Sequence, residues 1–104
     1  MDDPVLRRLK TALVALYGDR LERAVLFGSR ARGDHVADSD YDVAVFLHGH
    51  LPADFAREGA RLAEIEATIV RDMEAVVTAL PFPAHAYRHR TPIMHAIRRD
   101  GLDL

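Results

Sequence analysis

Cysteine is absent from this chain of 104 residues, which excludes disulfide bonds and thiolate metal sites. Long apolar runs are absent too, since none approaches the ~20 residues needed to cross a bilayer. The first four residues, Met1-Asp2-Asp3-Pro4, are acidic where a signal peptide would be basic. We therefore expect a cytoplasmic protein without a membrane-spanning segment.

Length and composition are those of a small globular protein. Apolar residues make up 49% of the chain and charged residues 29%, which is ordinary for a folded domain. A chain of this size buries somewhat more than ~60% of the surface that it exposes when unfolded, which is enough for a hydrophobic core. We expect residues 1–104 to form a single domain.

The net charge of −2 hides an uneven distribution. Four aspartates and no lysine or arginine lie between residues 34 and 42, whereas no acid lies between Ala75 and Arg99. The second stretch is either a solvated basic face or a binding surface, and its sequence leaves both open. Direct nucleic-acid binding is not expected, because Tyr87 is almost alone among these cations and single-strand binders interleave aromatic residues.

Periodicity and turn residues predict an α/β (α+β) fold, a small mixed sheet flanked by helices in the order α-β-(short α)-β-α-β-α. A helix should begin after the N-cap Asp3 and end at Gly18, with Leu16 in its buried stripe. A second helix should begin at Pro52, with Phe55 buried and with Glu58–Arg61 and Glu64–Arg57 pairs on its exposed side. The predicted strands are residues 24–27, 40–47 and 75–80, the last ended by Pro81 and Pro83, and a final helix follows Thr91-Pro92 as far as Arg99.

The most informative stretch begins with Gly28-Ser29, directly after a predicted buried strand. A glycine there allows a ligand to approach the backbone, and the free amides of the following turn favour an anion. Arg30 and Arg32 add forked donors that suit phosphate oxygens. These four residues are candidates for binding a nucleotide's phosphates.

Asp40 and Asp42 are candidate metal ligands. They are two residues apart on a predicted strand, so both carboxylates should leave the same face, ~6.5–7 Å apart at Cα. Magnesium prefers hard oxygen ligands and usually joins one or two carboxylates to substrate phosphates. A lone Gly-Ser or a lone Asp-x-Asp is weak evidence, but both occur here, with ten residues between Ser29 and Asp40 and a predicted strand on each side.

This combination resembles the signature of the DNA polymerase β-like nucleotidyltransferase superfamily. The string from Leu26 to Gly33, followed by Ser39-Asp40-Tyr41-Asp42, is similar to its smallest members, the minimal nucleotidyltransferases (MNT). The resemblance implies a two-metal Mg²⁺ site on Asp40 and Asp42, with ATP as substrate and Gly28 and Ser29 on its β/γ-phosphates. It also implies an antitoxin that adenylylates a HEPN-domain ribonuclease toxin encoded beside it.

One departure from the family pattern concerns a third carboxylate on the next strand. The predicted third strand contains no acid, and Glu74 at its edge is the nearest catalytic candidate. Asp72-Met73-Glu74 also continues the preceding helical pattern, so Glu74 could be only a solvated helix end. An alternative function is therefore a catalytically weak or inactive MNT-fold module that masks its HEPN partner sterically.

The remaining candidates carry less weight. His35 lies in the loop of the motif, and His48 and His50 flank Gly49 without further metal ligands, so we expect solvated histidines rather than a site. Tyr41 should point away from Asp40 and Asp42 and pack in the core. The nucleobase preference, the acceptor residue and the oligomeric state are not determined by the sequence.

Overall fold

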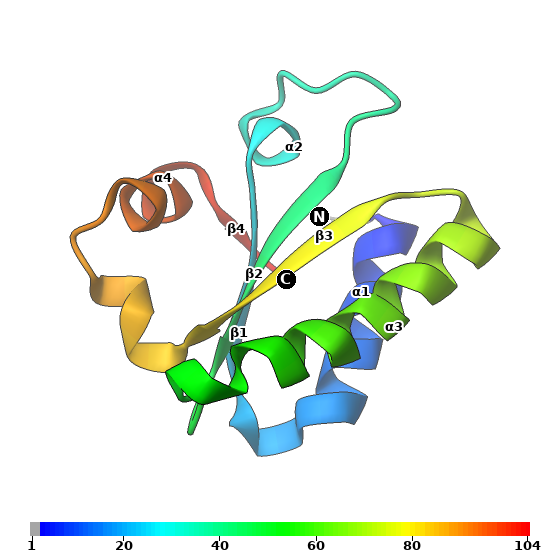
Figure 1. Ribbon diagram of the computed structural model, residues 1–104. Coiled ribbons are helices and arrows are strands. Elements are labelled where there is room, and N and C mark those ends of the chain that lie inside the picture. Colours follow the sequence, from blue (N-terminus) through cyan, green and yellow to red (C-terminus); the bar gives the residue numbers. More distant parts are fainter. Residues whose placement is uncertain (1–2) are drawn as a thin grey trace.

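The computed structural model describes residues 3–104, in which helices cover both faces of a four-stranded sheet (Figure 1). The α/β fold expected from the sequence is confirmed, and the short β4 is an addition that the sequence did not predict. The helices are α1 (Pro4–Tyr17), α2 (Ser29–Arg32), α3 (Phe55–Met73) and α4 (Pro92–Asp100). The strands are β1 (Leu21–Phe27), β2 (Tyr41–Leu47), β3 (Val77–Pro83) and β4 (Leu102–Asp103). The 3₁₀ turns are η1 (Gly18–Arg20), η2 (Pro52–Asp54) and η3 (Ala84–Arg88).

The sheet has the order β3-β2-β1-β4. β2 pairs parallel with β3, whereas β1 pairs antiparallel with both β2 and β4. Because β1 and β2 run in opposite directions, the end of β1 meets the beginning of β2, and Phe27 lies beside Asp42. The two halves of the sequence motif therefore meet at one end of the sheet.

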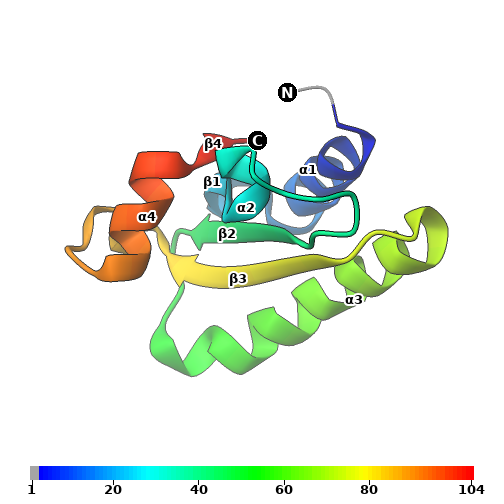
Figure 2. The ribbon, with the colours of Figure 1, turned by 90° about the horizontal axis from the view of Figure 1, so that it is seen from above.

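The alternating side chains of β2 separate two hydrophobic clusters. Val43, Val45 and Leu47 are fully buried and pack with residues of α1 and α3. Ala44 and Phe46 point to the opposite face and pack with Met94 and Ile97 of α4. Figure 2 shows the same division from above, with α4 on one side of the strands and α1 and α3 on the other. Asp42 is two residues before Ala44, so its side chain lies on the same face of the sheet, the face covered by α4 (the α4 face).

Helix α1 begins and ends at the residues that the sequence predicts. The Asp3 carboxylate accepts hydrogen bonds from the amides of Val5 (2.8 Å) and Leu6 (3.3 Å), which satisfies the first free donors of the helix. Gly18 ends the helix at φ +53°. Leu16 was predicted to be buried and is 38% exposed, because the helix turns that position away from the sheet.

Strand β3 corrects the prediction that Pro81 and Pro83 end a strand. The strand begins two residues later than predicted, at Val77, and continues through both prolines. β3 is an edge strand, and the Ala79 amide points away from β2 and donates to the Glu66 carboxylate at 2.8 Å. Positions 81 and 83 follow Ala79 at intervals of two, so their backbone nitrogens also face the open edge. Proline is tolerated there because no neighbouring strand needs an amide hydrogen.

Helix α3 corrects the predicted burial of its first turns. Phe55 is 56% exposed, whereas Glu58, expected on the solvent side, is fully buried. Leu62 and Ile69 are the buried apolar residues of this helix. The predicted Glu64–Arg57 pair is replaced by contacts of Arg57 with Asp54 (3.0 Å) and Glu58 (3.8 Å).

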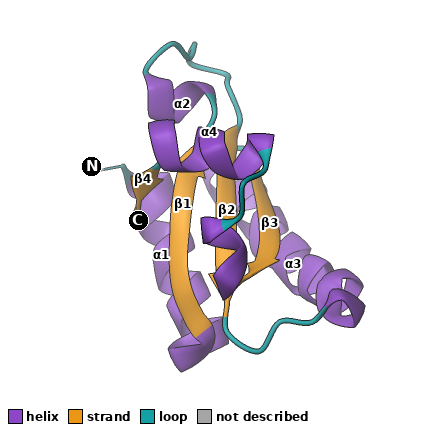
Figure 3. Ribbon diagram, turned by 90° about the vertical axis from the view of Figure 1, so that its left-hand side faces the viewer, coloured by secondary structure: helices purple, strands orange, loops and turns teal. Residues whose placement is uncertain are grey.

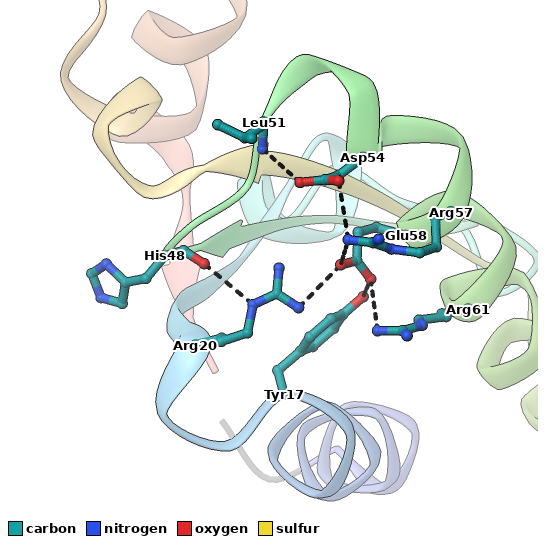
Figure 4. A network of polar contacts seen from close by, with 8 residues as sticks. All are labelled: Tyr17, Arg20, His48, Leu51, Asp54, Arg57, Glu58 and Arg61. Carbon is teal, nitrogen blue, oxygen red and sulfur yellow. Dashed lines mark hydrogen bonds and ion pairs between the residues drawn. The ribbon is translucent and has the colours of Figure 1, made fainter.

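Glu58 is tolerated in the interior because donors surround it (Figure 4). The Tyr17 hydroxyl donates to Glu58 Oε1 at 3.2 Å, and the guanidinium of Arg20 approaches Oε2 at 3.1 Å. Arg61 contributes a third contact at 3.5 Å. Burial, and next the Glu58 charge, raise the pKa of Tyr17 to about 12. This cluster joins α1, η1 and α3 at the start of β1, which is the end of the sheet opposite the motif.

The final helix is confirmed, with the Thr91 hydroxyl capping Met94 and with Gly101 at its C-terminal end. No helix in the described range, residues 3 to 104, combines the length and the apolarity required to span a bilayer.

Candidate nucleotide site

Gly28 adopts a backbone conformation that only glycine adopts readily. It follows β1 at φ +76°, ψ −158°, and its carbonyl accepts from the amides of Ala31 and Arg32, both at 3.1 Å. A Cβ at this position would lie 2.7 Å from Oδ2 of Asp42. The missing side chain therefore makes room for the carboxylate on the neighbouring strand.

The two aspartates occupy different positions relative to β2. Asp42 is its second residue and is partly buried on the α4 face, whereas Asp40 precedes the strand and is exposed. Burial, and after it the charge of Asp40, raise the pKa of the Asp42 carboxyl above its ordinary value. Bringing a second carboxylate close to a desolvated one costs free energy, which a bound cation would offset.

Tyr41 points the other way, as predicted, and joins the core on the α1 side. Its hydroxyl donates to Oδ2 of Asp3 at 2.9 Å, so the N-cap of α1 is bonded to the first residue of β2. Burial, followed by the Asp3 contact, raises the pKa of Tyr41.

Arg30 is engaged within the protein. Its guanidinium lies 3.9 Å from the centre of the Tyr41 ring and donates to the carbonyls of Ser39 (2.8 Å) and Ala37 (3.0 Å). These contacts attach α2 to the loop that leads into Asp40. The sequence suggested a phosphate ligand at Arg30 and contained no signal for these contacts, because they depend on how the loop folds back.

Arg32 and Ser29 are placed differently. Arg32 is exposed and its side chain contacts Asp34 at 3.2 Å, a contact in solvent that contributes little to stability. Ser29 begins α2 directly after Gly28 and is partly exposed. Figure 3 shows α2 above the strands and above α4, at the end of the sheet where Gly28 and Asp42 meet.

Glu74 lies outside β3. It is the C-cap residue of α3, exposed, at φ +54°, and three residues before the strand begins. The residue of β3 that pairs with Asp42 in register is Thr78, which is exposed. In the described chain, residues 3–104, no three His, Asp or Glu side chains come together as a metal-binding group. The acidic part of the site therefore consists of the two aspartates.

Two carboxylates without a third ligand still fit Mg²⁺. This ion usually retains several waters and takes one or two protein carboxylates together with substrate phosphates. Burial and the charge of Asp40 both disfavour the ionised Asp42 carboxylate, and a bound cation would offset both effects. Asp40 and Asp42 are the residues that would hold the ion.

The fold and the site define a small α/β protein whose glycine turn and paired aspartates lie together, as phosphoryl or nucleotidyl transfer requires. The sequence profile of the nucleotidyltransferase domain family matches residues 6–94. The chain therefore belongs to the nucleotidyltransferase domain family.

Similar proteins include a curated relative and a solved structure. The Methanocaldococcus jannaschii protein named "Putative protein adenylyltransferase MJ0141" is 37% identical over 43 residues, which cover 41% of this chain and 43% of that protein. The match thus spans less than half of the relative's length. The crystal structure of a toxin-antitoxin with AMP-PNP superposes with a TM-score of 0.65 over 93% of this chain and 69% of that chain, at 18% identity. At this identity the likeness concerns the fold.

Proposed function

We propose that this nucleotidyltransferase transfers AMP from Mg²⁺-bound ATP to a hydroxyl of a partner protein. The observation that carries the proposal is the packing of Asp42 against Gly28, which brings a carboxylate to the turn expected to hold phosphates. The name of the M. jannaschii relative supports a protein acceptor. The toxin-antitoxin with AMP-PNP supports an adenine nucleotide and a toxin partner.

The reaction that we propose is a substitution at the α-phosphorus. A bond forms between the acceptor oxygen and the α-phosphorus, the bond to the β-phosphate bridging oxygen breaks, and pyrophosphate leaves while the hydroxyl proton is released to solvent. When bound, Mg²⁺ supplies charge neutralisation for the phosphates. In this chain Asp40 and Asp42 would hold the ion, and Gly28, Ser29 and Arg32 would contact the triphosphate. Arg30 would act on the site through the loop rather than by touching phosphate.

The partner that we propose is a HEPN-domain toxin encoded beside this chain, as the motif resemblance implies. Neutralisation would then follow from covalent modification in the cytoplasm. Co-expression should leave one or more AMP groups on the toxin, detected as increments of its mass, and Ser29→Ala should reduce them.

A second candidate function is steric masking without catalysis. The observation that favours it is the position of Glu74 outside β3, which leaves Thr78 beside Asp42. A toxin that the wild type neutralises without any mass increment would establish masking and reject adenylylation.

The first prediction concerns nucleotide binding. Calorimetry should detect ATP binding that requires Mg²⁺, because two carboxylates alone repel a triphosphate. Asp40→Asn/Asp42→Asn should abolish it. Asp38→Asn is the matched control, because Asp38 is an exposed aspartate of the same loop. Equal affinities of the double variant and the wild type would reject the site.

A further inference from the structure

A cationic surface formed by η3 and α4 has no role in the site described above. Its members are exposed, and they lie in a stretch without a single acid: His85, Arg88, His89, Arg90, His95 and Arg98. An open depression of about 430 Å³ runs through it, lined by Arg90, Thr91, Pro92, His95 and Arg98. We call this set the η3–α4 surface.

Two arginines of this surface have no partner within the described part of the protein. Arg88 and Arg90 have no hydrogen bond or ion pair with any residue in the described range 3–104. Arg98 donates to the backbone carbonyls of Tyr87 and His89, which orients its guanidinium without neutralising it. By contrast, Arg8 and Arg71 on the opposite side of the molecule both bond to Asp72. Unpaired guanidinium groups favour an anionic partner.

The α4 part of the η3–α4 surface is next to the nucleotide site, whereas η3 follows Pro83, which pairs with Leu47 at the opposite end of β2. Met94 and Ile97 pack α4 against the sheet face to which Asp42 belongs, and α4 crosses the strands below α2 (Figure 3). Arg99, and more weakly Arg32 of α2, hold the pKa of Asp100 below its ordinary value, so the end of α4 is within electrostatic reach of the motif. A molecule bound to α4 would therefore lie close to the reacting phosphates.

We propose that the η3–α4 surface docks an acidic segment of the acceptor protein and so brings its hydroxyl to the nucleotide. The acceptor part of this proposal rests on the proposed function, whereas the docking part does not. Ile93, 40% exposed among the charges, offers the apolar contact that a protein segment can use.

A protein segment fits this surface better than a nucleic acid does. The aromatic ring that bases would need is already covered, because Tyr87 lies under the Arg23 guanidinium at 3.9 Å and packs edge-on against Phe46. Proteins that bind single-stranded nucleic acids combine a positively charged groove with aromatic faces on which the bases stack.

The test uses a fluorescent glutamate-rich peptide that contains one tyrosine, measured by anisotropy at low salt without ATP or Mg²⁺. Arg88→Gln/Arg90→Gln should weaken its binding by about tenfold, since two exposed ion pairs are lost. Arg8→Gln/Arg71→Gln removes the same charge from another face and should change binding by less than about twofold. Thermal unfolding of both variants verifies that they fold.

Three results would overturn the proposal. The control pair could weaken binding as much as Arg88→Gln/Arg90→Gln does, or the glutamine version of the peptide could bind as well as the original. An oligouridylate of equal charge could instead bind more tightly and depend on Arg88 and Arg90, which would make this a nucleic-acid surface. A separate incubation of the tyrosine peptide with Mg²⁺ and ATP tests AMP transfer. Absence of transfer there would count against the proposed function and would leave the docking result, obtained without nucleotide, intact.

Discussion

Gly28 and Gly33 both have positive φ, yet only one of them lies against another residue. At Gly33, φ +85° and ψ 7°, nothing lies within 4 Å of an added Cβ, so Gly33→Ala should cost only the left-handed strain of about 1 kcal/mol. At Gly28 the backbone strain is larger and the Cβ meets Asp42 Oδ2. We expect Gly28→Ala to cost about 3 kcal/mol and to weaken Mg²⁺–ATP binding.

The measurement is urea unfolding of both alanine variants, with calorimetry for ATP. Adding Asp42→Ala to Gly28→Ala should recover part of the lost stability, because the contact is removed. A Gly28→Ala protein as stable as Gly33→Ala would show that the carboxylate moves aside at no cost.

Asp42 should make stability depend on pH in the nucleotide-free protein. Its pKa is raised by burial and by Asp40, so the protonated form is favoured in the fold. The stabilising contribution of the protonated Asp42 carboxyl is therefore fully present below its pKa in the unfolded chain. This contribution is lost as the pH rises through its pKa in the folded protein. Asp42→Asn should accordingly be more stable than the wild type at neutral pH, and the two should converge near pH 4. Urea unfolding across this range tests the sign, with Asp38→Asn as the control.

At the scale of elements, the contacts of Arg30 connect α2, the loop after it and β2. Lysine cannot donate to two carbonyls and cover the Tyr41 ring at once. We therefore expect Arg30→Lys to speed amide hydrogen exchange over residues 34–40 without nucleotide, and Arg32→Lys to leave it unchanged. If Arg30→Lys weakened ATP binding but left exchange unaltered, Arg30 would be a phosphate ligand, as the sequence had indicated.

Much of the fold was accessible from sequence because its signals are local. The N-cap at Asp3, the strand–glycine turn at Gly28 and the cap at Thr91 each depend on neighbours a few residues away. The proline-containing part of β3 was not predicted, because proline is tolerated in a strand only at an unpaired edge. Whether a strand lies at the edge depends on the order of the whole sheet, which local sequence does not show. The contacts of Arg30 and the burial of Glu58 likewise depend on residues distant in the chain.

At the scale of the whole molecule, Glu58 stabilises the end of the sheet opposite the nucleotide site. Glu58→Gln keeps an acceptor for Tyr17 but leaves Arg20, Arg57 and Arg61 crowded without their anion. Because these arginines are partly exposed, we expect a loss of about 2 kcal/mol, below the value for a fully buried pair. Glu64→Gln, exposed on the same helix, should change stability by less than about 0.5 kcal/mol.

Urea unfolding measures the loss of stability. ATP calorimetry of the same variants shows whether the effect is confined to this end of the sheet. Affinity for Mg²⁺–ATP should be unchanged in folded Glu58→Gln, since the cluster and the motif lie at opposite ends of β1. A loss of affinity at unchanged stability would mean that the two ends are coupled.

The bond between Asp3 and Tyr41 has a consequence for how the protein responds to warming. Helix ends fray before the rest of a domain unfolds. Here Asp3, the N-cap of α1, also bonds to Tyr41, whose ring contacts the Arg30 guanidinium. Heat that loosens this cap would release the loop leading to Asp40 while the sheet is still intact. We therefore expect nucleotide binding to be lost at a temperature below the melting temperature of the domain.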